Sequence, residues 1–277
     1  MKRPEAIRMP DDLSSARLNA TYWDQVADTY QRETHISTRD FHYGPLLPGD
    51  KELGILPAIT PGMRCLEIGG GAGQNSLYLA RLGADCTVLD ISEKQLEHGR
   101  RLAGEEHLDV AFRCAAMDAL PEGLGRFDLI HSTYALPFAD DPEQVVAKCS
   151  AGLKPGASLV ITTGHPLYGG EWVKLDEGER GVFLRDYFHP PADTRLTDDN
   201  EAMTIAHAYP VSEVVNWVLR SGLHLRRLEE PRPLDLPGMT AEEIAERVPY
   251  YSEGWRANFD AIEMIPIVVV IRADRPT

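Results

Sequence analysis

The sequence predicts an α/β fold in which a doubly wound, mostly parallel sheet is covered by helices on both faces. Strand-like apolar runs alternate with helical segments from about residue 61 to residue 165, and a glycine-rich loop (69–73) directly follows the first run. A last apolar run, IPIVVVIRA, occupies residues 265–273. Strands that are apolar on both faces and connected by helices are typical of parallel sheets buried between helical layers.

The first half of the predicted core contains two strand–helix units. MRCLEIG (63–69) predicts a strand, and QNSLYLARLG (74–83) predicts a helix that ends at its glycine. DCTVLDI (85–91) predicts the second strand. The next helix (92–106) begins at Ser92, whose hydroxyl can cap the first turn.

The remaining core elements continue the alternation. Pro142 lies near the first turn of a predicted helix and Gly156 past its end, which is the usual placement of these residue types. The predicted strands are 110–116, 127–132, 157–165, 223–230 and 265–273, and the predicted helices are 141–156 and 211–222.

Three segments lie outside this alternation and predict additions to the core. Residues 1–58 are predicted to form an N-terminal helical cap, with a helix over 15–35, and residues 59–277 the core domain. Two substrate-side inserts are predicted within the core, at about 166–208 and 236–262. A connection as long as the first insert usually has a function of its own or covers a site.

Composition and charge narrow the class of partner. The 277 residues are 43% hydrophobic and 26% charged, which is ordinary for a soluble globular enzyme. The formal net charge of −15 repels phosphate groups, so nucleic acid and anionic membranes are poor partners. A neutral or cationic small molecule is easier to accommodate. The charge is equally consistent with a role in solubility alone.

The sequence carries no recognisable targeting or membrane-spanning signal. It has no apolar run of about 18 residues, and the N-terminus lacks an apolar signal-peptide core. None of the four cysteines has CxxC spacing, which argues against zinc and redox motifs. We therefore expect a cytoplasmic protein without a metal site. The oligomeric state stays open, with a homodimer as one option.

The glycine loop defines the expected ligand site, because ligands of doubly wound folds bind beyond the first strand. The dinucleotide pattern GxGxxG fails here: its third glycine falls on Gln74 when counted from Gly69, and on Ser76 when counted from Gly71. The pattern E-x-G-x-G-x-G, which begins at Glu67, stands instead. An acidic side chain at this strand end suits a cationic ligand and disfavours a nicotinamide dinucleotide.

Two further acidic residues follow later strands. Asp90 ends the second strand, 17 residues after Gly73, where a carboxylate can accept hydrogen bonds from both hydroxyls of a ribose. Asp118, in the segment MDALP after the third strand, could accept a hydrogen bond from an adenine amino group.

This combination resembles the class I S-adenosylmethionine-dependent methyltransferases. The segments that match their successive motifs are LEIGGGAG (66–73), VLDIS (88–92), AAMDALP (115–121) and the run from Phe127 to Thr163. The resemblance is strong from Tyr22 to Ser132 and extends in outline to Ala273. It implies a Rossmann-like sheet of seven strands in the order 3-2-1-4-5-7-6, with only the seventh strand antiparallel.

The resemblance also implies S-adenosylmethionine as the cofactor and assigns residues to it. Its methionine end would be held by Glu67 and by the backbone of Gly69, Gly71 and Gly73. His131 and Ser132 would line the region of the methionine or the sulfonium. A tyrosine of the N-terminal cap, Tyr30 or Tyr43, would contact the methionine carboxylate.

The adenosine end is assigned in the same way. Asp90 would bind the ribose, and Ile91 would pack on the adenine. Met117 and Asp118 would flank the adenine, with Asp118 at the amino group.

Methyl transfer from a sulfonium is an in-line displacement, so the protein chiefly aligns the reactants and excludes water. His165, at the end of the fifth predicted strand, is the first candidate for a general base or for orienting the acceptor, with Tyr168 close behind. The alternative is a histidine that hydrogen-bonds its own turn. His42, from the N-terminal cap, is a further catalytic candidate.

The aromatic-rich inserts predict a compact, partly apolar pocket for a small-molecule acceptor. We expect an aromatic or heteroaromatic specialised metabolite of natural-product biosynthesis, such as an indole-like or phenolic ring, methylated at carbon, nitrogen or oxygen. His189 could reach the pocket, and Tyr251 and Trp255 could form one of its walls or pack a helix on the sheet. A cofactor-binding protein without catalysis and a protein methyltransferase stay open as alternatives.

Overall fold

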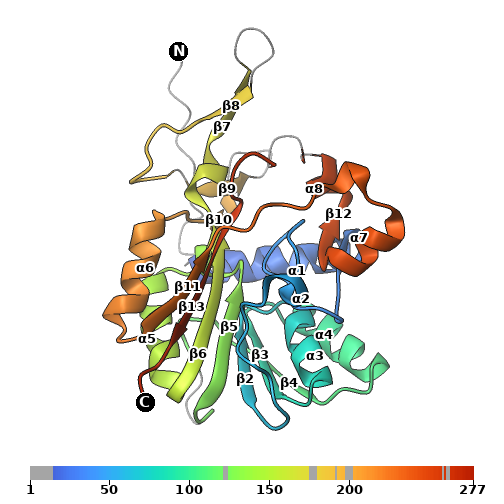
Figure 1. Ribbon diagram of the computed structural model, residues 1–277, viewed down its shortest axis with the longest axis vertical. Coiled ribbons are helices and arrows are strands. Elements are labelled where there is room, and N and C mark those ends of the chain that lie inside the picture. The colour runs from blue at the N-terminus through green and yellow to red at the C-terminus, as the bar shows by residue number, and fades with distance from the viewer. Residues whose placement is uncertain are drawn as a thin grey trace.

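The computed structural model describes residues 15–120, 124–174, 180–190, 192–196, 202–257, 259 and 263–277. Its centre is a seven-stranded sheet in the order β11-β13-β6-β5-β2-β3-β4 (Figure 1). These strands are β2 (Arg64–Ile68), β3 (Asp85–Asp90), β4 (Val110–Cys114), β5 (Phe127–Thr133), β6 (Leu153–Gly164), β11 (His224–Glu229) and β13 (Val268–Asp274). Among the described residues, no helix is long and apolar enough to cross a bilayer.

The sheet has the predicted topology. Along the chain, β2 is the first core strand and β13 the seventh, so the spatial order is 3-2-1-4-5-7-6. The strands β4, β3, β2, β5 and β6 pair in parallel, whereas β13 is antiparallel to both β6 and β11. The predicted fold class is therefore confirmed. Strand order reverses between β2 and β5, which is where doubly wound folds open a ligand crevice.

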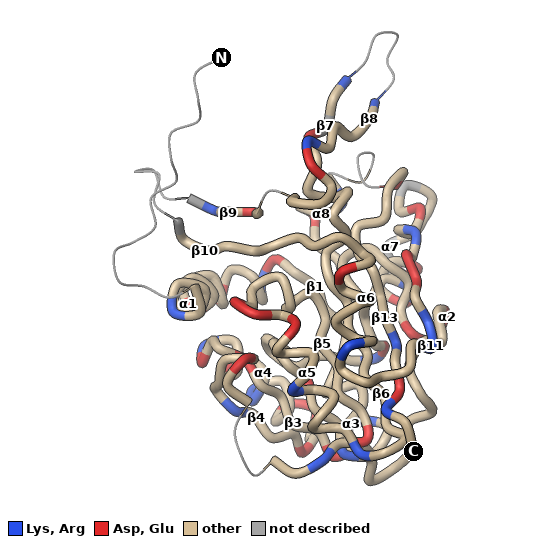
Figure 2. Tube along the Cα trace, turned by 90° about the vertical axis from the view of Figure 1, so that its left-hand side faces the viewer, with Lys and Arg blue, Asp and Glu red and all other residues tan. Residues whose placement is uncertain are grey.

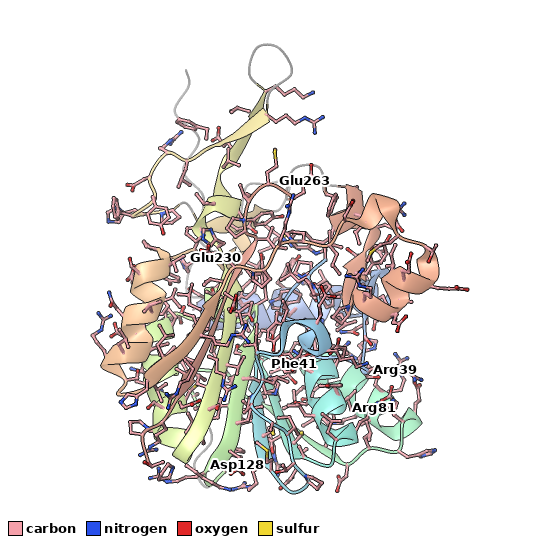
Figure 3. All side chains as sticks on the ribbon, viewed as in Figure 1. Arg39, Phe41, Arg81, Asp128, Glu230 and Glu263 are labelled. Atoms are coloured by element: carbon pink, nitrogen blue, oxygen red, sulfur yellow. The ribbon has the colours of Figure 1, made fainter. Side chains whose placement is uncertain are left out.

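Helices cover both faces of the sheet. On one face, α5 (Pro142–Gly152) and α6 (Val211–Arg220) bury Val146 and Trp217 in a common apolar cluster with the strands. On the other face, α3 (Gln74–Arg81) buries Leu79 together with Phe41 from the preceding segment (Figure 3). A further helix, α4 (Glu93–Glu105), packs on β3 and β4.

The boundary between α5 and β6 differs from the prediction by four residues. The helix expected over 141–156 ends at Gly152, and β6 begins at Leu153 instead of residue 157. Leu153 pairs with Phe127 of β5, and the register then shifts before Ser158. Pro155 has no amide hydrogen for a helical bond, so an extended chain with an irregularity is favoured here.

The additions to the core form small elements of their own. The N-terminal segment contains α1 (Ser15–Glu33), β1 (Thr34–Ile36) and α2 (Asp50–Leu53). The first insert contains two hairpins, β7 (Glu171–Lys174) with β8 (Arg180–Phe183) and β9 (Asp193–Leu196) with β10 (Ala202–Ala206). The second contains α7 (Ala241–Arg247), β12 (Tyr250–Ser252) and α8 (Glu253–Ala257), and β12 pairs with β1. The division into cap and core at residue 58 stays a prediction.

Helix α1 is fastened to the core. The Oδ1 atom of Asp24 accepts hydrogen bonds from Ser92 Oγ at 2.6 Å and from the Lys94 amide at 3.1 Å, both at the start of α4. In Figure 2, β10 passes above α1, and the two elements are in contact. The N-terminal helix and the first insert therefore meet above the carboxyl ends of the strands.

Candidate active site

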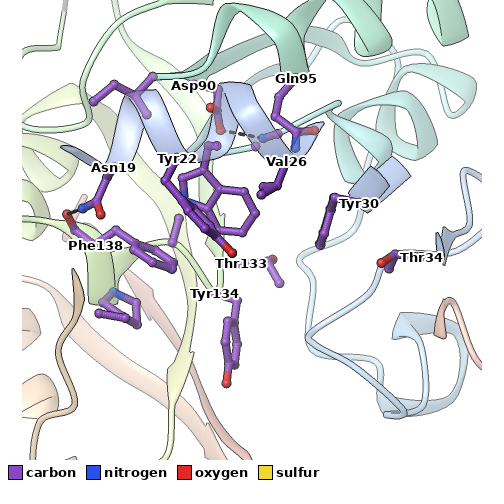
Figure 4. A pocket seen from close by; sticks show the side chains of 18 of the residues that line it. Asn19, Tyr22, Val26, Tyr30, Thr34, Asp90, Gln95, Thr133, Tyr134 and Phe138 are labelled. Atoms are coloured by element: carbon purple, nitrogen blue, oxygen red, sulfur yellow. Dashed lines mark hydrogen bonds between the residues drawn. The ribbon is translucent and has the colours of Figure 1, made fainter. Parts of the chain in front are cut away.

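A cavity of about 990 Å³ lies at the crevice beyond β2, β3 and β5. Its walls come from α1, the glycine loop, the segments after β4 and β5, the β9–β10 hairpin (residues 193–196 and 202–206) and β12. Figure 4 shows Asp90 and Gln95 along one side of the cavity and Tyr134 on the opposite side. This volume is at the upper end of the range for small-molecule sites, about 300–1,000 Å³, so two ligands can share it.

The glycine loop presents bare backbone to this cavity at Gly71. Its φ of 57° lies in the left-handed region, and a Cβ built there would meet only Gln95 Oε1, at 3.8 Å. Gly69 also lines the cavity, but packing dictates its identity, because a Cβ there would lie 2.3 Å from Ala135 Cβ. Gly71 therefore leaves open space where a ligand can approach the main chain.

Asp90 lies directly beside Gly71. Its Oδ2 accepts a hydrogen bond from the Gly71 amide at 2.7 Å, and its Oδ1 accepts one from the Ser92 amide at 2.8 Å. Burial raises the pKa of Asp90, and these backbone bonds oppose the rise. Each carboxylate oxygen has a second lone pair, so Asp90 can still accept two hydroxyl groups from the cavity.

Glu67 is a buried carboxyl group at the end of β2. Its Oε2 accepts hydrogen bonds from the Ser76 amide at 3.0 Å and the Ser76 hydroxyl at 2.6 Å. Burial raises its pKa to about 7. No lysine or arginine among the described residues pairs with it, so a cationic ligand in the cavity would stabilise its charged form.

Three glutamines connect α1 to the walls of this part of the cavity. Gln31 Nε2 donates to Gln95 Oε1 at 2.8 Å, and Gln74 Nε2 donates to Gln31 Oε1 at 3.0 Å. The Nε2 atom of Gln95 is buried without a partner, so it is a donor available to a ligand. Sequence analysis missed this network, because residues 31 and 95 are distant in the chain and carry no motif.

The other part of the cavity is walled by aromatic rings. Trp23 makes edge-to-face contacts with Tyr22 and with Phe138, with ring centroids 5.5 Å apart in both cases. Tyr168 and Trp255 lie 5.6 Å apart on a different wall. Aromatic faces can hold a planar ring and can stabilise a nearby positive charge.

The comparisons with known proteins agree with this geometry. Residues 66–161 match a family described as a methyltransferase domain. A solved S-adenosylmethionine-dependent methyltransferase from Mesorhizobium loti is 26% identical and has a TM-score of 0.63. The match covers 80% of this chain and 95% of that one. Residues 66–161 are therefore a methyltransferase domain, and the chain has the fold of the S-adenosylmethionine-dependent methyltransferases. Its cofactor is S-adenosylmethionine, and the carboxylates, the bare backbone at Gly71 and the unpartnered Gln95 donor fit that molecule.

Curated relatives match a shorter part of the chain than this solved structure does. Ubiquinone biosynthesis O-methyltransferases from Caulobacter vibrioides and Coxiella burnetii are 36% and 31% identical over 111 and 102 residues. These matches cover 40% and 37% of this chain, which spans less than half of each relative's length, 44% in both cases. The [4+2]-cyclase SpnF, 18% identical with a TM-score of 0.61 over 97% of this chain and 98% of its own, shares the fold alone.

Most of the residues assigned to the cofactor lie at this cavity. Those that line it are Tyr30, Glu67, Gly69, Gly71, Asp90, Ile91, Met117 and Asp118. The three residues predicted at the adenine, Ile91, Met117 and Asp118, lie together on the wall formed after β3 and β4. Their individual roles stay predictions.

Two glycine-loop and cap assignments need correction. Tyr43 is fully buried and its hydroxyl donates to Asp50 Oδ1 at 2.5 Å, so it holds the turn before α2 and does not line the cavity. Gly73 is the N-cap of α3. A Cβ at this position would lie 2.8 Å from Val88 of β3, so Gly73 packs against the sheet and does not line the cavity.

His131 and Ser132 also lie below the cavity. His131 is completely buried against Phe41, and Ser132 Oγ donates to the carbonyl of Ile68 at 2.9 Å. The reason is that β5 ends one residue later than predicted, at Thr133. The cavity is therefore lined by Thr133 and by the residues that follow it, including Tyr134.

His165 reaches the cavity wall, and both of its ring nitrogens have partners. Its Nδ1 accepts a hydrogen bond from the Leu167 amide at 3.2 Å, so the ring proton is on Nε2, 3.0 Å from Glu230 Oε1. Burial lowers the pKa of His165, and Glu230 opposes this. The alternative of a histidine that caps its own turn is the one observed, and a role of His165 as a general base or in orienting the acceptor stays a prediction.

His42 lines the cavity in a different state. Its Nδ1 is buried without a partner, and its ring packs edge-on against Tyr250 at 5.2 Å. Burial lowers the pKa of His42 to about 3, so the ring is neutral at physiological pH. The Tyr250 hydroxyl in turn shares a 2.7 Å hydrogen bond with that of Tyr30.

Of the insert residues singled out in the sequence, two line the cavity and two do not. Tyr168 and Trp255 line the cavity, as the aromatic composition suggested. His189 is not part of the lining; its side chain is 87% exposed and faces Asp186. Tyr251 is also outside the lining and donates to Glu253 Oε1.

Proposed function

We propose that the protein transfers the methyl group of S-adenosylmethionine to a small aromatic or heteroaromatic molecule, a specialised metabolite. The observation that carries this proposal is the continuity of the cavity. One space of about 990 Å³ is bounded by Gly71 and Asp90 at one part and by Tyr168 and Trp255 at another. A cofactor and a planar acceptor can therefore lie in contact inside one enclosure, which in-line transfer requires.

When bound, S-adenosylmethionine supplies an electrophilic methyl group on a sulfonium. The chain's own residues bind and orient. Asp90 would accept the ribose hydroxyls, and Gln95 Nε2 would donate to the same molecule. The charge on Glu67 would stabilise the positive cofactor. Helix α1 and the β9–β10 hairpin would exclude water from the reacting atoms.

The residues predicted as a histidine–tyrosine pair would orient the acceptor and not deprotonate it. Both nitrogens of His165 are engaged, and the low pKa of His42 makes it a weak base. Tyr168 keeps its hydroxyl proton, since burial raises the pKa of this side chain. Tyr168 would donate a hydrogen bond to the acceptor, and neutral His42 would hold the Tyr250 side of the cavity.

Oxygen is the favoured atom of methylation within this proposal. The support comes from the curated relatives, whose names describe O-methyltransferases of ubiquinone biosynthesis. A phenolic ring would combine that chemistry with the aromatic walls. Because those relatives align with only part of the chain, the acceptor of this protein need not be a ubiquinone precursor.

The first test is calorimetry with S-adenosylhomocysteine on the wild type and on Asp90→Ala. We expect micromolar binding by the wild type and a loss of at least tenfold in the variant, since Asp90 contacts both the loop and the ligand. No binding by the wild type would overturn the proposal.

A second assay distinguishes the alternatives. Labelled S-adenosylmethionine is incubated with a panel of phenols, indoles and amines, and product is followed by mass. Cofactor binding without any labelled product would favour a protein that binds the cofactor without methyl transfer. Labelling of protein substrates alone would favour a protein methyltransferase.

A further inference from the structure

Strand β10 of the β9–β10 hairpin is hydrogen-bonded to α1 at the edge of the cavity. Asn19 of α1 accepts hydrogen bonds through Oδ1 from Thr204 Oγ1 at 2.7 Å and from the Ile205 amide at 3.2 Å. Its Nδ2 donates to the carbonyl of Phe138 at 3.2 Å. The hairpin is thus tied to α1 and to the segment after β5. Thr204 pairs with Arg195 in the hairpin, which places Arg195 of β9 beside α1.

Two charged side chains of β9, Asp193 and Arg195, line the cavity. The guanidinium of Arg195 lies 5.3 Å from the centre of the Tyr22 ring and donates to the Tyr22 hydroxyl. No carboxylate among the described residues pairs with Arg195. A guanidinium has five N–H donors, so most of its donors are available to a ligand.

The two charges act on different parts of the cavity. Burial raises the pKa of Tyr30 to about 12, and the positive charge of Arg195 opposes this rise. Asp193 instead adds to the effect of burial in raising the pKa of Tyr134 and of Tyr168. Arg195 therefore faces the Tyr30 side under α1, and Asp193 faces the Tyr168 side.

We infer that the acceptor carries an anionic group, a carboxylate or an equivalent acid, which Arg195 binds beside Tyr22 and Tyr30. This inference rests on the proposed function and adds the class of acceptor: an aromatic acid. A planar guanidinium stacked on an aromatic ring matches a carboxylate through two parallel hydrogen bonds. Tyr30 feels the charges of both Arg195 and Asp90, so Arg195 lies where the aromatic wall meets the cofactor part of the cavity. Asp193 would repel an acid placed on the Tyr168 side and so fix its orientation.

The test compares three probes of similar size: 4-hydroxybenzoate, its neutral amide 4-hydroxybenzamide and the cation 4-hydroxybenzylamine. Binding is read from quenching of tryptophan fluorescence, since Trp23 and Trp255 line the cavity. Each titration is made with and without S-adenosylhomocysteine. The variants are Arg195→Gln, Asp193→Asn and the control Arg220→Gln, which removes a positive charge paired with Glu143 outside the cavity.

We expect the wild type to bind the benzoate at least tenfold more tightly than the amide, as for a charge-assisted hydrogen bond. Arg195→Gln should abolish this preference, Asp193→Asn should increase it, and Arg220→Gln should leave it unchanged. Equal binding of benzoate and amide, a preference for the amine, or no benzoate binding at millimolar concentration would overturn the inference. Calorimetry with S-adenosylhomocysteine on the same variants reports on the cofactor site separately. If the wild type does not bind S-adenosylhomocysteine, the proposed function itself has failed.

Discussion

Substitution of Gly71 by alanine separates the cost of backbone strain from the cost of filling the cofactor site. Gly71 has φ 57° and lines the cavity, whereas Gly54 has φ 58° at the end of α2 and does not. A Cβ at Gly54 meets nothing within 4 Å, and one at Gly71 meets only Gln95 Oε1 at 3.8 Å. Gly54→Ala is therefore a matched control for left-handed strain without a clash.

The expected magnitudes follow from this pairing. A left-handed alanine costs about 1 kcal/mol, so each variant should lower the melting temperature by about 2–4 °C. In Gly71→Ala the added methyl group also occupies space that the cofactor backbone contact requires. Forcing a methyl group into an occupied site costs about 1–3 kcal/mol, which is roughly a five- to 150-fold loss of affinity.

The assay is thermal unfolding of both variants together with calorimetric titration of S-adenosylhomocysteine. Gly71→Ala should bind weakly and Gly54→Ala like the wild type. The reasoning is refuted if Gly71→Ala binds with wild-type affinity. It is also refuted if Gly54→Ala loses as much affinity, because strain alone would then explain the effect.

Three more predictions address the buried polar groups. The folded pKa of Glu67, about 7, exceeds its unfolded value of 4.5, so the protonated form favours folding and wild-type stability falls as pH rises from 4.5 to 7. The variant Glu67→Gln lacks this titration. The free energy of unfolding of the variant minus that of the wild type, measured with urea, should therefore rise by about 3 kcal/mol between pH 4.5 and pH 8. A difference that does not change with pH would contradict the assignment. His165→Asn keeps an N-cap acceptor, so methyl transfer should stay within a few-fold of the wild type at each pH. Loss of the low-pH limb of the rate profile, where a general base becomes protonated, would support His165 as a base. Tyr30→Phe and Tyr250→Phe should each cost about 1–3 kcal/mol, because one buried hydroxyl loses its partner, and the double variant should cost less than the sum; strict additivity in a double-mutant cycle would argue against the 2.7 Å bond.

That Glu67, Gly71 and Asp90 line one cavity was predictable because the segments that carry them are local in sequence. Glu67, Gly71 and Asp90 lie at the ends of two neighbouring parallel strands, β2 and β3, and the pattern of such strands fixes where their ends meet. The errors there are errors of one residue or one turn. His131 and Ser132 were misplaced because β5 extends to Thr133, and strand ends depend on pairing that sequence does not reveal.

The acceptor half was not predictable to the same degree. Arg195 and Tyr134 reach the cavity from segments whose positions are set by contacts across large sequence distances, such as Asn19 with Thr204. His165 shows the converse: its place at a strand end was foreseen, but its partners Leu167 and Glu230 decide its protonation. Only the folded geometry shows that its ring nitrogens are already in use.

This division explains why the fold constrains the cofactor more tightly than the reaction. The loop from Gly69 to Gly71 is fixed by packing against Ala135 and by the bond from Gly71 to Asp90, so few other ligands suit it. The aromatic wall, by contrast, is built from α1, two inserts and the segment after β5, which lie outside the seven-stranded sheet. The [4+2]-cyclase SpnF has the same fold under a name that describes a different reaction, as expected where one fold hosts several functions. The charge of Arg195 at that wall is therefore the feature by which this chain would select its acceptor, and it is there that a change of acceptor would first be made.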